Sequence, residues 1–226
     1  MDYIQYLSQF NLLKELSTKD LLEMDQLTSI TVFQKNTFIQ TPETYREGFY
    51  FIKKGKVRLY KLSAEGKQFT SDILGEGNVF GEMDVLSLGT RENYIEAIEE
   101  SHICLMNRDR FESFIIHRPG FMMNLLKVLS ERINGMSQLT ENLAIGNLHE
   151  KIVFVLLKLA DQFGVTENDD YYQINYSLSH QEIANLVGAT REAVSVSIQE
   201  LAKDKRIRTG FKTIAVHRDL FVARKL

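Results

Sequence analysis

The residues best suited to specific recognition chemistry lie in the segment 179–201, SHQEIANLVGATREAVSVSIQEL. Arg191 offers a planar fork of hydrogen-bond donors, and the adjacent Glu192 offers two carboxylate acceptors. An apolar stripe at steps of four and three runs along the same segment: Val194, Ile198 and Leu201. This spacing predicts a helix with Arg191 and Glu192 on its polar side. Such side chains at the start of an exposed helix can hydrogen-bond to base edges in a DNA groove.

A second, shorter helix is predicted just before this one. Ser179, followed three residues later by Glu182, has the spacing of a capping box that begins a helix. Gly188 supplies a turn where a positive φ is cheap, and Thr190 can cap the following helix. Together these features predict a helix-turn-helix. Helix hairpins of this size are common and mostly structural, so the pattern alone leaves a structural role open.

The residues after the helix pair raise the specificity of the pattern. Residues 207–216 read as a β-hairpin with basic side chains, and residues 203–206 are Lys-Asp-Lys-Arg. A hairpin in this position predicts a wing, which completes a winged helix-turn-helix. The net charge of the chain is −3, but residues 177–226 carry +4 and the remainder carries −7. Positive potential suited to phosphates is therefore concentrated at the C-terminal end, although a chance excess of solvated lysines explains the asymmetry equally well.

Other site chemistry finds little support in the sequence. Cys104 is the single cysteine, which excludes an internal disulfide framework and an iron-sulfur cluster held by several thiolates. His102 shares a predicted strand face with Cys104, but two ligands do not make a metal site, and a redox role for Cys104 requires exposure and a lowered pKa. No nucleophile-base signature or phosphate-binding P-loop is present. We therefore predict no metal, no cofactor and no enzymatic activity.

The N-terminal half must supply the scaffold. Residues 30–107 consist of short runs rich in Val, Ile, Phe, Tyr and Thr separated by glycines, which predicts an antiparallel β-roll or jelly roll. Val57 and Leu59 alternate with Arg58 and Tyr60, as expected for a half-buried strand. A short helix over 109–116 is predicted to end at residues 117–120, before a longer helix begins.

The longer helix carries a seven-residue repeat. Its predicted dimer seam comprises Met122, Leu126, Leu129, Ile133, Met136, Thr140 and Leu143. Leu125, Val128 and Leu139 lie just off this seam, so one face can meet a second copy while another packs on the chain's own β-domain. Packing of the whole stripe on the β-domain is the alternative. We predict a parallel homodimer with its two-fold axis along this helix.

The rest of the chain is predicted to hold a helix over 149–163, a surface loop over 166–170 and a strand over 172–176. The domain boundaries expected from this organisation are 1–118, 119–145 and 146–226. The sequence shows no bilayer-spanning apolar stretch and no secretory signal at its start, so a cytoplasmic location without membrane association is expected.

Several motifs occur along the chain in the same order as in a known protein family. They are Gly66 and Gly77, Phe80-Gly81-Glu82, Glu141-Asn142-Leu143-Ala144, and Gln181-Glu182-Ile183-Ala184 followed by Arg191-Glu192. Over nearly its full length the chain resembles the Crp/Fnr (cyclic-AMP receptor protein/fumarate-nitrate regulator) family. The resemblance implies an α+β fold, with an N-terminal antiparallel β-roll like cyclic-nucleotide-binding domains, a long dimerisation helix and a C-terminal winged helix-turn-helix. It further implies a homodimeric transcription regulator that binds near-palindromic double-stranded DNA and contacts RNA polymerase.

The resemblance also assigns roles to residues of the helix-turn-helix. Arg191 matches a position that contacts guanine, and Glu192 matches one that accepts from the cytosine amino group. Ser195 is a third candidate contact. Val196 stands where the best-known relatives carry a base-reading arginine, so the preferred half-site should differ from theirs. The candidates for phosphate contacts are His180, Lys203, Arg206 and Lys212.

An effector pocket is implied at Gly81, Glu82, Arg91 and Ser137. In cyclic-nucleotide binders of the family the arginine is followed by a hydroxyl residue, whereas here Glu92 follows Arg91 and the connection from Glu82 is one residue shorter. Met136 replaces one of two hydroxyls that meet adenine. We therefore expect control by a different small molecule or a constitutively competent dimer, not by cyclic AMP. The alternative function is a ligand-binding module that regulates a protein partner.

Overall fold

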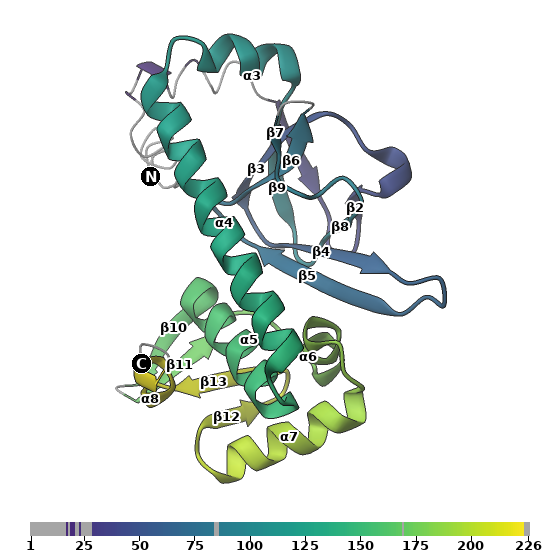
Figure 1. Ribbon diagram of the computed structural model, residues 1–226, viewed down its shortest axis with the longest axis vertical. Helices are drawn as coiled ribbons and strands as arrows, with labels where there is room; N and C mark the ends of the chain where they lie inside the picture. The colour runs from purple at the N-terminus through teal and green to yellow at the C-terminus, as the bar shows by residue number, and fades with distance from the viewer. Residues whose placement is uncertain are drawn as a thin grey trace. The chain divides into compact units, whose positions relative to one another are not determined.

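In the computed structural model the chain folds into two compact units (Figure 1). One unit comprises Met1–Lys61 with Ser71–Gly135, and the other Leu62–Thr70 with Met136–Leu226. The three-part division at residues 118 and 145 stays a prediction. The residues that the structure describes are 17, 19, 20, 23, 29–83, 86–168 and 170–223.

Two antiparallel sheets, as the sequence predicted, lie in the first unit except for Leu62 and Gln68–Thr70 at the ends of two strands. One sheet has the order β1-β9-β3-β6-β7 and the other β2-β8-β4-β5. The strands are β1 (Ser29–Phe33), β2 (Phe38–Gln40), β3 (Gly48–Lys54), β4 (Val57–Leu62), β5 (Gln68–Leu74), β6 (Val79–Met83), β7 (Leu86–Ser87), β8 (Tyr94–Ala97) and β9 (Ser101–Met106). Pro42 begins a short 3-10 helix between β2 and β3, outside the strands.

Successive side chains of the central strands enter two different apolar clusters. Phe49 and Phe51 of β3 belong to one cluster, while Ile52 of the same strand packs with Phe80 in the other. This follows from the pleat, which sends neighbouring side chains to opposite faces of a sheet. Tyr60 departs from the predicted alternation: it is buried, because its ring stacks on Tyr94 with the centroids 5.3 Å apart.

Two helices close the first cluster. In α3 (Arg108–Ile115), which begins after the N-cap Asn107, the buried Phe111 and Phe114 join the β3 phenylalanines. The long helix α4 (Pro119–Ile145) contributes Phe121 and Leu125 to the same cluster. Pro119 and Gly120 therefore lie inside α4, and the predicted break there was placed too late. Proline suits the first turn of a helix because a backbone N–H at that position would have no acceptor within the helix.

The structure shows part of what was predicted for the two faces of α4. Leu125 is buried and Val128 packs against the same cluster, as predicted for the face toward the β-domain. Five residues of the predicted seam are exposed: Met122, Leu126, Ile133, Met136 and Thr140. Leu129 also packs against the chain's own cluster, and Leu143 is half-buried.

The second unit is built on a four-stranded sheet of order β10-β11-β13-β12. Its elements are α5 (Leu148–Phe163), β10 (Gly164–Asn168), β11 (Tyr171–Ile174), α6 (His180–Val187), α7 (Arg191–Lys203), β12 (Ile207–Gly210), β13 (Thr213–His217) and α8 (Asp219–Ala223). The predicted loop over 166–170 was wrong for residues 166–168, which belong to β10, and β11 ends before Asn175. Strand pairing decided these bounds, which the side-chain pattern did not reveal.

Candidate functional site

Local sequence rules account for the helix-turn-helix formed by α6 and α7. The Ser179 hydroxyl accepts a hydrogen bond from the Glu182 N–H at 3.2 Å, and the Glu182 carboxylate accepts one from the Ser179 N–H at 2.7 Å. Gly188 ends α6 with φ 68°, and Thr190 caps α7 by accepting from the Ala193 N–H at 3.3 Å. These reciprocal caps satisfy N–H groups that a helix start otherwise leaves without a partner.

The predicted apolar stripe of α7 is buried, which fixes the face that the helix turns to solvent. Val194, Ile198 and Leu201 are all buried. Arg191 and Glu192 are exposed in the first turn of α7, and Val196, one turn beyond Glu192, is 57% exposed. Within the described part of the chain, no ion pair joins Arg191 to Glu192. Donor, acceptor and apolar groups therefore stand side by side on one solvent-facing surface.

Ser195 is the candidate base contact whose surroundings the sequence did not anticipate. Its hydroxyl donates to the Arg191 carbonyl at 2.9 Å and lies 2.8 Å from Nδ1 of His180 on α6. Since the hydroxyl has one proton, Nδ1 of His180 acts as the donor in the second bond. The structure thus joins a predicted base contact to a predicted phosphate contact. The bond holds α6 and α7 together beside Arg191.

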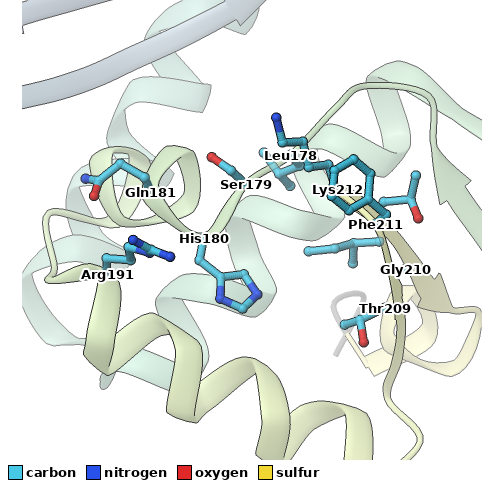
Figure 2. Close-up of a pocket in the computed structure, with 11 residues that line it drawn as sticks. Leu178, Ser179, His180, Gln181, Arg191, Thr209, Gly210, Phe211 and Lys212 are labelled. Carbon is cyan, nitrogen blue, oxygen red and sulfur yellow. The ribbon is translucent and has the colours of Figure 1, made fainter.

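A cleft of about 430 Å³ lies between the start of α6 and α7 and the wing formed by β12 and β13. Figure 2 shows the His180 ring in the space between Arg191 and the wing residues Thr209 and Gly210. Lys212 lies on the wing side of the same cleft. Arg191, His180 and Lys212, which sequence analysis proposed separately, are therefore gathered around one cleft.

The other two phosphate candidates lie elsewhere on the unit. Lys203 is the last residue of α7, and Arg206 follows shortly after it; both are exposed. A helix rises about 1.5 Å per residue, which puts roughly 18 Å along the axis between Arg191 and Lys203. The cleft also includes Gln181, Thr209 and Phe211, to which the sequence assigned no contact with DNA. For Phe211, the sequence signal was an aromatic residue within the basic hairpin predicted over 207–216.

A buried hydrogen bond ties α7 to α5. The Ser197 hydroxyl, on a residue only 4% exposed, lies 2.9 Å from Nδ1 of His149. Nε2 of His149 lies 3.6 Å from the Glu200 carboxylate. These contacts give His149 a structural role. They connect α7 to α5.

We expect Ser197→Ala to lower the free energy of unfolding by about 1 kcal/mol, because it removes one partly buried hydrogen bond. Urea unfolding of the two single variants, Ser197→Ala and His149→Ala, and of the double variant would measure the coupling between the two side chains. Additive losses would show that the bond contributes nothing.

Three residues of the predicted effector pocket, Gly81, Glu82 and Arg91, lie in the first unit. Gly81 lies on β6, and its N–H donates to the Thr90 hydroxyl at 3.0 Å. The Glu82 carboxylate accepts a hydrogen bond from the Arg91 backbone N–H. The Arg91 guanidinium carbon lies 4.9 Å from the centroid of the Tyr45 ring. Arg91 is exposed, and no ion pair with Glu92 is present among the described residues.

Arg132 on α4 is a charged residue close to the predicted pocket residue Glu82. It is half-buried, and burial lowers its pKa, while the Asp72 and Glu82 carboxylates act in the opposite direction. Its position follows from the helical period, since residue 132 repeats the face of Leu125 and Val128. Ser137, the fourth residue of the predicted pocket, is exposed on α4.

His102 and Cys104, both on β9, have different surroundings. Cys104 is 1% exposed within the first cluster, which removes the exposure that a redox role requires. Nε2 of His102 lies 3.4 Å from the Glu100 carboxylate. No group of three potential metal ligands occurs among the residues that the structure describes. Nor does any helix in that part of the chain have the length and apolar character to cross a membrane.

Comparisons with known proteins agree with this architecture. A family model described as a cyclic nucleotide-binding domain matches residues 30–118, and one described as a Crp-like helix-turn-helix domain matches residues 150–219. The CRP-like cAMP-activated global transcriptional regulator of Mycobacterium tuberculosis is 30% identical over 176 residues, 78% of each chain. The global nitrogen regulator of a Nostoc species is 30% identical over 198 residues, 87% of this chain and 88% of that protein.

A solved structure adds the fold. A CooA mutant from Carboxydothermus hydrogenoformans matches with a TM-score of 0.76 at 23% identity, covering 96% of this chain and 94% of the other. A β-roll, a long helix and a winged helix-turn-helix define a class of DNA-binding transcription regulators. The chain belongs to the Crp/Fnr family of that class, and it carries a helix-turn-helix DNA-binding domain. Regulators of this type bind DNA and typically act as dimers, and the matched relatives carry the names of regulators.

Proposed function

We propose that the chain forms a homodimer that reads a near-palindromic operator through the first turns of α7 and is not controlled by cyclic AMP. The observation that carries this proposal is the exposed surface of α7, where Arg191, Glu192 and Val196 lie together on a buried scaffold. Arginine is suited to O6 and N7 of guanine, glutamate to the cytosine amino group, and valine to a thymine methyl group. In this proposal the domain boundaries are 118/119 and 145/146.

The proposed phosphate contacts fall into two groups. His180 and Lys212 line the cleft beside Arg191, so they would orient the start of α7 in the groove. Lys203 and Arg206, at the far end of α7, would reach phosphates further along or strengthen the surrounding positive potential. Ser195 already donates to the Arg191 carbonyl, so its remaining role toward DNA is that of an acceptor or of a support for His180.

The exposed residues of α4 support self-association. Met122, Leu126, Ile133 and Met136 form an apolar stripe along one side of the helix, and Leu129 and Leu143 border it. A second copy of the same helix would cover this stripe through a symmetric interface. A dimer would present two α7 helices to two half-sites about one helical turn of DNA apart.

Two features of the pocket support independence from cyclic AMP. Glu92 directly follows Arg91 and puts a carboxylate where relatives have a hydroxyl donor. The Glu82 carboxylate, which in cyclic-nucleotide binders takes a ribose hydroxyl, here already accepts from the Arg91 N–H. Arg132, on which the Asp72 and Glu82 carboxylates act, adds a charge close to Glu82 that would suit a small ligand other than cyclic AMP. Contact with RNA polymerase and a cytoplasmic location complete the proposal.

The test is a selection of bound duplexes from a random pool by the effector-free protein at a stated salt concentration. We expect a palindrome to be enriched equally with and without cyclic AMP. In Arg191→Ala, discrimination at one base pair of each half-site should fall about 10- to 100-fold, because a bidentate contact is lost. The matched control is Arg218→Ala, which removes the same charge at a different site. Arg218 directly follows β13 and forms an ion pair with Asp170.

Each outcome has a defined meaning. If Arg191→Ala selects the same palindrome as the wild type with equal discrimination, Arg191 does not read the base. If no duplex is enriched, the selection is repeated with cyclic AMP and with cell extract. Enrichment that appears only with cyclic AMP would overturn the proposed independence. Continued failure would overturn the DNA-reading assignment and favour a ligand-binding module that regulates a protein partner.

A further inference from the structure

The tip of the wing carries an aromatic side chain that the proposed function has not used. Phe211 is 90% exposed and follows Gly210, whose backbone pairs with Thr213 at the end of the hairpin. Lys212 completes the two-residue turn with φ 55°. The Lys212 carbonyl accepts a hydrogen bond from the Leu178 N–H at 2.9 Å, so the tip is anchored to the segment that enters α6. Phe211 is therefore an exposed ring on a fixed support.

Single exposed apolar residues are common on protein surfaces, so exposure alone assigns no role to Phe211. Its surroundings are more informative. Phe211 borders the cleft that also contains His180, Arg191 and Lys212, and no acidic residue is among those lining the cleft. The Lys212 ammonium lies 5.8 Å from the centroid of the Phe211 ring. An aromatic ring surrounded by hydrogen-bond donors and cations suits a polyanion that also offers apolar surfaces, as DNA does.

We infer that Phe211 is a minor-groove contact that inserts against the bases or sugars flanking each half-site. This inference rests on the proposed binding of DNA by α7. One sugar-phosphate strand separates the major groove from the neighbouring minor groove. With the start of α7 in the major groove, that strand would run through the cleft, within reach of His180 and Lys212 (Figure 2). The wing tip on the far side of the cleft then faces the minor groove.

An inserted apolar ring has a predictable effect on sequence preference. Apolar wedges in the minor groove partly unstack a base step and bend the duplex. Pyrimidine-purine steps such as TpA are the easiest to open. Phe211 would therefore add a preference for flexible flanking steps that α7 does not touch, and this preference should be separable from the reading of the half-site by Arg191.

The experiment compares the full-length wild type with Phe211→Ala, Phe211→Leu and the control Val165→Ala. Val165 is 53% exposed on β10, at the opposite edge of the same sheet. The probes are fluorescent duplexes with identical half-sites and either a TpA or a GpC step in each flank, plus a random-sequence duplex at low salt. We expect Phe211→Ala to weaken binding to the TpA duplex about tenfold and to abolish the flank preference. Phe211→Leu should retain part of both.

The result separates this inference from the proposed function. Arg191→Ala should lose half-site discrimination and keep the flank preference, whereas Phe211→Ala should do the reverse. Equal binding of the wild type and Phe211→Ala to every duplex, the random one included, would overturn the minor-groove contact even if Phe211 serves a protein partner. The random duplex decides the matter if no operator is found. Thermal unfolding should be unchanged in Phe211→Ala, because the ring makes so little contact with the rest of the protein.

Discussion

Ile133→Asp is expected to convert the protein to a monomer and to weaken its binding to an operator with two half-sites by about 100-fold or more. Ile133 is 66% exposed in the single chain, so the substitution leaves the fold of each chain intact. In the proposed dimer the symmetric interface would contain two copies of the new carboxylate, close to the two-fold axis. Burying charges without partners opposes association strongly. The two recognition helices would then no longer bind as one unit.

The matched control for Ile133→Asp lies on the same helix. Met123 is 65% exposed on α4 but points about 100° away from the predicted seam. Met123→Asp adds the same charge and removes a similar apolar surface, yet should leave the molecular mass and operator affinity unchanged. Analytical ultracentrifugation and titration of a labelled operator measure the two quantities. A dimeric Ile133→Asp protein with normal operator affinity would show that the α4 stripe is not the interface.

Gly81→Ala is expected to lower the free energy of unfolding of the first unit by about 3 to 5 kcal/mol. Gly81 has φ 118°, a conformation that side chains rarely adopt. A Cβ atom added there would lie 2.1 Å from the Gly48 carbonyl oxygen on the neighbouring strand β3. Strands β3 and β6 would have to separate. The hydrogen bond from the Gly81 N–H to Thr90, just before Arg91, would be disturbed with them.

A substitution at a second glycine, Gly66, distinguishes the effect of backbone strain from that of a steric clash. Gly66 also has a positive φ of 77°, but an added Cβ would meet no atom within 4 Å. Gly66→Ala should therefore cost only the backbone strain, about 1 to 2 kcal/mol. Urea unfolding followed by tyrosine fluorescence and circular dichroism would compare the two variants. Equal losses at both positions would contradict the packing argument at Gly81.

Much of the architecture could be predicted because its causes are local in the chain. The Ser179–Glu182 capping box and the glycine at position 188 define a helix-turn-helix within a few residues, and each was found as expected. The period of Val194, Ile198 and Leu201 identified the buried side of α7, and with it the outward position of Arg191. The β-roll followed from short glycine-bounded strands, although Thr166 showed that strand pairing can extend into a polar run.

The contacts that shape the sites could not be predicted in the same way, because they join residues far apart in the sequence. The bond between His180 and Ser195 depends on the angle at which α6 meets α7, and that between His149 and Ser197 on how α5 packs beneath them. The collection of Arg191, Lys212 and Phe211 around one cleft requires the hairpin to return beside α6.

By itself the sequence determined the order of elements, the helix caps and the residues that α7 exposes to solvent, since propensity, capping and periodicity act over one or two helical turns. Only the tertiary structure decided which of those residues share a cleft, which are already engaged, and that Arg132 lies near Asp72 and Glu82. These facts depend on sheet register and helix packing. Both are set by contacts across the fold, whose geometry no short segment contains.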